Sequence, residues 1–92
     1  MEFEWDPIKA ELNLQKHGVS FSEAASVLGD TLSVTVSDPD HSLDEERYIT
    51  VGLSHLSRLL IVAHTDRGDN IRIISARELT RQERRVFEDD KF

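Results

Sequence analysis

The chain of 92 residues contains no cysteine, and this absence excludes disulfide bonds and metal sites built from thiolates. It also lacks a run of about eighteen apolar residues, so we expect no transmembrane helix. The N-terminal segment MEFEWDP is acidic and has no apolar centre, unlike a signal peptide. We therefore expect a single domain over residues 1–92, without a membrane segment, in the reducing cytoplasm.

Positive charge is also scarce, because 11 Lys and Arg residues stand against 18 Asp and Glu residues, for a net charge of −7. Residues 1–46 contain eleven acids and two lysines, a balance of −9, whereas residues 47–92 contain nine bases and seven acids, a balance of +2. All eight arginines lie between Arg47 and Arg85. Loose coating of nucleic acid is therefore not expected, but a local basic face can still bind a polyanion.

The first thirty residues predict a short strand and two helices. Phe3 and Trp5 alternate with glutamates, which indicates a strand with one buried face. Asp6-Pro7 is a typical helix start, and Gly18 supplies the left-handed stop after His17. A second helix begins after a Ser-x-x-Glu capping box, residues 20–23, and its apolar residues follow at helical spacing.

The remainder predicts four strands and a last helix. The strands are expected at residues 32–36, 47–53, 58–65 and 71–77. Thr80 and Glu83 form a further capping box, which opens a helix that runs at least to Phe87. The order β-α-α-β-β-β-β-α predicts a small α+β domain with an antiparallel-rich sheet, two N-terminal helices and a C-terminal helix.

Five arginines crowd into residues 69–85. Arg72 and Arg77 are five residues apart, so a regular strand would send them to opposite faces. Arg81, Arg84 and Arg85 share one helical face. A structural interpretation is that the last two pair with the acids at positions 88 and 89, while the long stems cover apolar surface.

An anion site is the alternative interpretation of these arginines. Arg81 lies in the first turn of the helix, where a cation opposes the macrodipole, and Arg85 adds a like charge one turn later. Local stability favours acids there, and a bound anion would reverse both penalties. Free N–H groups beside guanidinium groups suit a phosphate.

The four histidines differ in what their neighbours indicate. His64 ends a strand just before the turn at Gly68, which we expect to bring it beside Arg67 and Arg72, where it could exchange protons near neutral pH. A histidine at a strand end is as often structural. We expect His17 to act as a helix C-terminal residue and His55 as a turn residue.

The acidic loop around His41 raises the question of a metal site. Asp38, Asp40, Glu45 and Glu46 lie close to His41 in the sequence. Their spacing matches no established metal-binding pattern, and carboxylate clusters of this kind usually remain solvated. We therefore expect no metal and no cofactor.

Three long segments together resemble one family. They are FEWDPIKAELNLQKHGVSFSEAASVLGD at residues 3–30, DPDHSLDEERYITVG at 38–52 and HTDRGDNIRIISARELTRQERR at 64–85. The chain resembles the BrnT family, the toxins of bacterial type II toxin–antitoxin modules. The resemblance implies a RelE-like fold and an endoribonuclease that needs no metal and inhibits translation. It also implies a BrnA-like antitoxin with a ribbon-helix-helix region, through which alone the promoter DNA would be contacted.

The resemblance also extends to single positions. Arg72 and Arg77 match the family's R-I-I-S-A-R segment, and Glu45 and Arg47 match its E-x-R. Further matches are Arg67, Arg81, Arg84 and Arg85. The family often has tyrosine where this chain has Phe87, which can stack on a base but carries no hydroxyl to donate a proton.

The leading hypothesis is a metal-independent endoribonuclease toxin acting on RNA. Its expected catalytic residues are His64, Arg72, Arg77, Arg81 and Glu45. Its expected substrate-binding residues are Arg47, Arg67, Arg84, Arg85 and Phe87. The alternative is a toxin-fold binding module, weak or inactive as an enzyme, whose arginines grip the antitoxin and assist repression.

Overall fold

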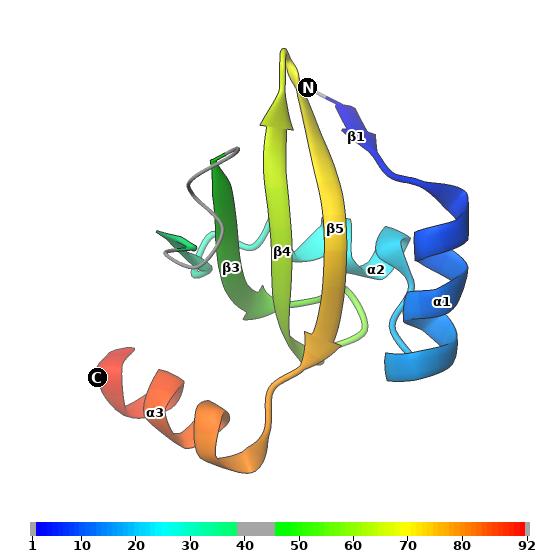
Figure 1. Ribbon diagram of the computed structural model, residues 1–92. Coiled ribbons are helices and arrows are strands. Elements are labelled where there is room, and N and C mark those ends of the chain that lie inside the picture. The colour runs from blue at the N-terminus through cyan, green and yellow to red at the C-terminus, as the bar shows by residue number, and fades with distance from the viewer. Residues whose placement is uncertain (1, 39–45, 92) are drawn as a thin grey trace.

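The computed structural model describes residues 2–38 and 46–91 (Figure 1). Its elements follow the predicted order. They are β1 (Glu2–Glu4), α1 (Pro7–His17), α2 (Phe21–Val27), β2 (Val34–Ser37), β3 (Arg47–Leu53), β4 (Leu59–Arg67), β5 (Asn70–Glu78) and α3 (Arg81–Lys91). The predicted α+β class is confirmed.

The strands form one five-stranded sheet in the order β1-β5-β4-β3-β2. β1 runs parallel to β5, and the other neighbours are antiparallel. α1 and α2 lie together on one side of the sheet, whereas α3 leaves the end of β5 toward the other side (Figure 1). We call the face turned away from α1 and α2 the open face.

The hydrophobic core lies between the sheet and the two N-terminal helices. Val19, Phe21, Ala24 and Val27 pack against Leu60, Val62, Ile73 and Ala76 of β4 and β5. Trp5 closes one end of this core with its ring edge-on to Phe21, at a centroid distance of 6.0 Å. A core on one face only explains why the opposite face remains available for binding.

The predicted start and stop of α1 are confirmed. The Asp6 side chain accepts the Ile8 N–H at 2.8 Å, Pro7 is the first helical residue, and Gly18 ends the helix at φ 69°. Glycine adopts this left-handed conformation without the steric cost that other residues incur.

The capping box predicted for α2 is confirmed in one half only. Ser20 Oγ accepts the Glu23 N–H at 3.0 Å. The buried Glu23 carboxylate instead accepts hydrogen bonds from Ser54 at 2.7 Å and from Nε of Arg58 at 2.9 Å. Arg58 also donates to Gly18 O at 3.0 Å. The hydrogen bonds from Arg58 lower the pKa of Glu23 below its usual value, although burial of the carboxylate acts to raise it. This arginine therefore joins α1, α2 and the β3–β4 connection.

Asn13 of α1 completes the edge of β5. β1 pairs only with Asn70–Arg72, so beyond that point the edge needs other partners. The buried Asn13 amide accepts the Ala76 N–H at 3.1 Å and donates to the Ala76 carbonyl at 2.8 Å. It donates to Val19 O as well, at 3.0 Å. One side chain thus takes the place of a neighbouring strand.

Replacing Asn13 tests this role. We expect Asn13→Leu to lower the free energy of unfolding by roughly 2–4 kcal/mol, because it leaves buried backbone groups without partners. Urea unfolding followed by circular dichroism measures the change. Gln15→Leu, at an exposed position of the same helix, is the control and should stay within about 0.5 kcal/mol of the parent. Equal stability of the two variants would show that the Asn13 contacts contribute little.

Candidate functional site

A one-residue bulge in β5 determines where its arginines lie. His64 pairs with Ile73, but the preceding Ala63 pairs with Ser75, so Ile74 is an extra residue in β5. The bulge resets the alternation of side chains. Arg72 and Arg77 consequently lie on the same open face, opposite Thr65 and Ile61 of β4. The prediction of opposite faces was wrong because it assumed a regular strand.

Strand register arranges the open face in three rows across the sheet. The first row is Val34, Val51, Ile61 and Arg77. The second row is Val36, Ile49, Ala63 and Ser75. The third row is Arg47, Thr65, Arg72 and Glu4. The face therefore has an aliphatic centre and an arginine border, which we define as Arg47, Arg72 and Arg77.

Carboxylates hold two arginines of the border in place. Arg72 Nη1 lies 3.1 Å from Glu4 Oε2. Arg77 makes a two-pronged ion pair with Glu83, at 2.8 and 3.0 Å. Hydrogen bonds from Arg77, and then from the Thr80 N–H, lower the pKa of Glu83 to about 2. Glu83 therefore stays charged at neutral pH and fixes the guanidinium group at the start of α3.

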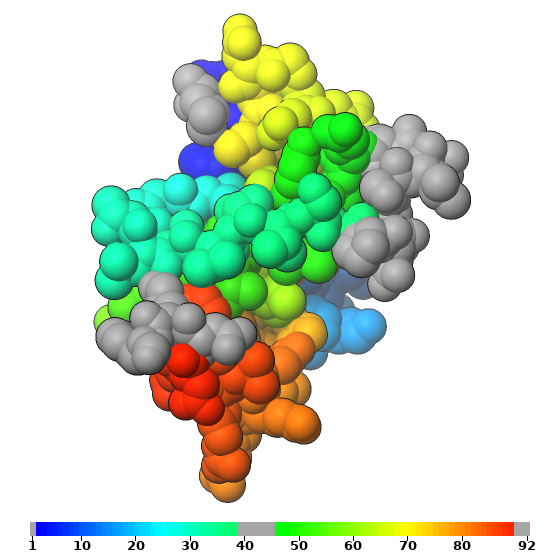
Figure 2. Space-filling model, turned by 90° about the vertical axis from the view of Figure 1, so that its left-hand side faces the viewer, coloured from blue at the N-terminus to red at the C-terminus, as the bar shows by residue number. Residues whose placement is uncertain are grey.

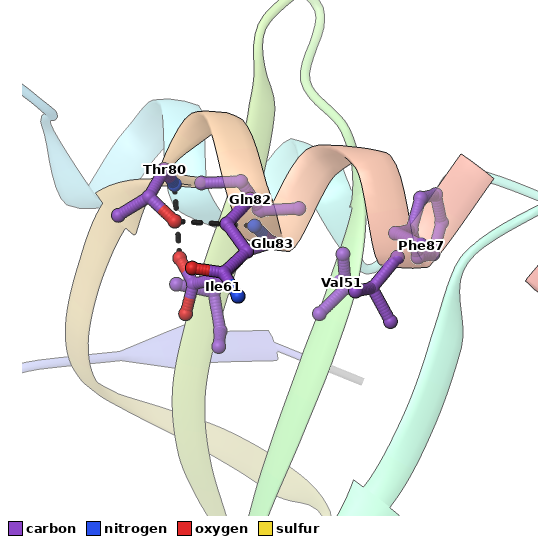
Figure 3. Close-up of a pocket in the computed structure, with 8 residues that line it drawn as sticks. Val51, Ile61, Thr80, Gln82, Glu83 and Phe87 are labelled. Carbon is purple, nitrogen blue, oxygen red and sulfur yellow. Dashed lines mark hydrogen bonds between the residues drawn. The ribbon is translucent and has the colours of Figure 1, made fainter. Parts of the chain in front are cut away.

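The predicted capping box of α3 is confirmed in both directions. The Thr80 N–H donates to Glu83 Oε1 at 2.9 Å, and the Glu83 N–H donates to Thr80 Oγ1 at 3.2 Å (Figure 3). The same carboxylate thus caps the helix and binds Arg77. This double role ties the orientation of α3 to the arginine border.

The two sides of α3 differ in character. Val86 and Phe87 line a groove of about 650 Å³ together with Val51 and Ile61 of the sheet. Figure 3 labels Phe87 on α3 and Val51 and Ile61 on the strands. The exposed arginines at positions 81, 84 and 85 lie on the opposite side of the helix. Among the described side chains, residues 2–38 and 46–89, they form no ion pair, so the predicted pairing with the acids at positions 88 and 89 is not seen.

His64 lies on the core side of the sheet, whereas the arginines that it was expected to join lie on the open face. Its side chain is 5% exposed and points to the same side of β4 as the core residues Leu60 and Val62. Nε2 lies 2.7 Å from Thr50 Oγ1, and the ring stacks on Tyr48. The expectation that the turn brings His64 beside Arg72 was wrong, because Arg72 pairs with the next residue, Thr65, on the open face.

Buried His64 has an unusual electrostatic setting. Nδ1 is buried and has no hydrogen-bond partner among the residues that the structure describes. Burial lowers the pKa of His64 below its usual value, and the Asp66 carboxylate opposes that shift. The neutral ring is therefore the form that the fold accommodates.

A different histidine reaches the open face, and no local sequence pattern predicted this position. The half-buried His17, at the end of α1, lines a hollow of about 240 Å³ with Ser75 and Arg77. The remaining lining residues are Ile49, Ile61, Ala63 and Ala76. Only the docking of α1 along the β5 edge brings His17 to this position.

The other predicted site residues are distributed along this side of the molecule. Arg47 begins β3, and Arg67 ends β4 beside the turn to β5. Figure 2 shows this turn at the top, the β2 region in the middle and α3 at the bottom. Glu45, like His41 and Asp40, lies outside the described residues.

In the part of the chain that the structure describes, no helix has the length and hydropathy needed to cross a bilayer.

Fold and site together define a small α+β domain with an arginine-bordered sheet face suited to binding phosphate groups. A family model described as "Ribonuclease toxin, BrnT, of type II toxin-antitoxin system" matches residues 5–83. The chain therefore belongs to the BrnT family of ribonuclease toxins, and its module includes an antitoxin.

A solved structure shows a similar fold. The crystal structure of the Brucella abortus ribonuclease toxin BrnT is similar with a TM-score of 0.66 and 23% sequence identity. The match covers 88% of this chain and 99% of that one. Among curated proteins, no relative matches the chain.

The setting of His64 predicts a pH-dependent stability. Its folded pKa lies below the unfolded value near 6.5, so its contribution is complete above that pH and is lost as pH falls through the folded pKa. Urea unfolding between pH 7.5 and 5 should show this loss. His64→Leu should flatten that part of the profile, whereas His55→Gln, at an exposed turn, should keep it. Parallel profiles for the parent and His64→Leu would contradict this account.

Proposed function

We propose that this chain is an endoribonuclease that inhibits translation by cutting RNA on its open face without a metal ion. The observation that carries the proposal is the bulge at Ile74, which places Arg72 and Arg77 on one face with Arg47. Membership of a ribonuclease toxin family supports it. Its neutralising partner would be a BrnA-like antitoxin whose ribbon-helix-helix region alone contacts promoter DNA.

The reaction needs a phosphate held beside a proton carrier. The ribose 2′-oxygen attacks the adjacent phosphorus and loses its proton to a base, while the 5′-oxygen leaves and receives a proton. The products are a 2′,3′-cyclic phosphate and a free 5′-hydroxyl group. Because the nucleophile belongs to the RNA itself, guanidinium groups suffice to stabilise the charge on the phosphorane.

The arginine border would bind the scissile phosphate. Arg72 and Arg77 take the transition-state role. Arg81, which the sequence predicted to be catalytic, lies on the outer side of α3, so it is proposed to hold a flanking phosphate. Arg77 keeps donors for this purpose, because Glu83 and the Glu78 carbonyl occupy only part of its five N–H groups. The fixed guanidinium geometry reduces the entropy lost on binding. Arg47, Arg67, Arg84 and Arg85 would hold flanking phosphates.

Proton transfer is assigned to His17 in place of His64. His17 shares the hollow with Arg77 and Ser75 on the open face, whereas His64 is buried on the other side. An imidazole can both accept and return a proton near neutral pH. Glu45, two residues before Arg47, remains the second proposed proton carrier. Phe87 is proposed to stack on a base from within the groove of α3.

A binding module is the alternative function. The observations that favour it are the existing ion pairs of Arg72 and Arg77 and the net charge of −7, all of which oppose RNA binding. In that case the arginines serve only the complex with the antitoxin. The two functions differ in whether the free chain cleaves RNA.

Arginine substitution separates the two functions. We expect induction of the parent chain alone to arrest growth with cleavage of cellular RNA. Arg72→Ala should lower the rate of cleavage about 100-fold or more, because a charge-stabilising donor is lost. Lys16→Ala removes an exposed cation from α1 and should retain the parent rate. Normal growth and intact RNA with folded parent protein would exclude the enzyme and favour the binding module.

The pH dependence of cleavage tests His17. His17→Gln should lower the rate about 100-fold or more and remove the pH dependence near neutrality, as loss of a general acid–base group does. His55→Gln, an exposed histidine elsewhere, should leave the rate and profile unchanged. If His17→Gln retained the parent profile, proton transfer would belong to another group.

A further inference from the structure

Exposed and half-buried aliphatic side chains adjoin one another beside the arginine border. Val34 and Val36 of the edge strand are 45% and 55% exposed, and Val86 of α3 is 55% exposed. Val51 and Ile61 connect the strand positions to the groove under α3, because Val34 pairs with Val51 and Val51 with Ile61. We call Val34, Val36, Val51, Ile61 and Val86 the aliphatic patch.

The chemistry of the patch suits a protein better than RNA. Single-stranded RNA is bound through aromatic rings that stack on bases and through cations that contact phosphates. The patch offers branched aliphatic side chains, which have no π-face and cannot pair with a base edge. Exposed apolar areas rimmed by polar residues are typical of protein–protein interfaces.

Charge at the rim indicates what such a partner carries. Arg47 and Arg77 belong to the rows that cross or border the patch. On the outer side of α3, the three exposed arginines have no carboxylate partner among the side chains of residues 2–38 and 46–89. A protein segment with apolar residues on one side and carboxylates on its flanks would bury its apolar side chains in the groove and pair its carboxylates with the arginines at the rim.

We propose that the aliphatic patch is the docking surface for the antitoxin. The occupant is an amphipathic antitoxin segment that places apolar side chains in the groove between α3 and the sheet and carboxylates beside Arg77. This inference rests on the proposed function, because it assigns a place to the antitoxin of the same module. A segment on the patch also covers the arginine border, so a single contact both holds the antitoxin and excludes RNA.

Two patch variants test the proposal against a matched control. Val36→Asp and Val34→Asp both change the edge strand, outside the groove in which Phe87 is proposed to stack on a base, and a failure of one variant to fold does not remove the test. Leu12→Asp alters an equally exposed side chain, 58% exposed on α1 on the other side of the molecule. The probes are the purified antitoxin of the module, titrated calorimetrically, and a single-stranded RNA oligonucleotide, whose cleavage by the free chain is measured.

We expect each patch variant to weaken antitoxin binding about 30-fold or more, as substitution of an interface hot spot does. RNA cleavage should stay within about twofold of the parent, and Leu12→Asp should bind antitoxin as the parent does. Growth arrest by the patch variants should then persist in the presence of antitoxin.

Other results have definite meanings. Unchanged antitoxin binding by both folded patch variants overturns the proposal. Loss of RNA cleavage with antitoxin binding retained also overturns it, because the patch would then bind substrate. A parent that cleaves no RNA but binds antitoxin through the patch supports the docking surface and overturns only the ribonuclease.

Discussion

The extra residue in β5 is the constraint on which the site depends. With Ile74 bulged, Ile73 and Ala76 both enter the core, while Arg72 and Arg77 both remain on the open face. A regular strand would send one of these arginines toward α1 and α2, where its burial without a partner would be costly. The Asn13 amide binds both backbone groups of Ala76, two residues after the bulged Ile74. Helix packing therefore holds the strand that aligns the arginines.

Coverage of only one sheet face explains how so small a domain can serve two partners. The N-terminal helices cover the core. Arg58 joins these helices through its hydrogen bonds to Glu23 and to the Gly18 carbonyl, so it does not belong to the open face. The open face is left with cations at its border and aliphatic side chains at its centre. Phosphates suit the border, and an apolar protein segment suits the centre. Because the two areas adjoin, occupation by the antitoxin would prevent occupation by RNA without any change of conformation.

Local signals predicted most of the fold and part of the site. Gly18 marks the C-terminus of α1 through its left-handed backbone conformation, and Thr80 marks the N-terminus of α3 through its capping hydrogen bond. Both effects depend on residues close in sequence, so these boundaries were predictable. The arginine-rich segment was visible in composition. The bulge at Ile74 was not, because it is defined by register with another strand. The position of His64 beside the arginines was predicted wrongly, because tertiary packing decides which face of the sheet it occupies. His17 was predicted correctly at the end of its helix, but its approach to Arg77 depends on how α1 docks and was not predictable.

The central claim is that the open face binds the RNA backbone through its arginine border. The most direct measurement is NMR titration of the isotopically labelled chain with a 2′-O-methylated single-stranded RNA, which binds but cannot be cut. If the arginine border binds RNA, we expect chemical-shift changes for the Arg47, Arg72 and Arg77 side chains and for neighbouring amides of β3–β5, with α1 residues 8–12 unaffected. Changes concentrated on the outer side of α1, or none at saturating RNA, would contradict it.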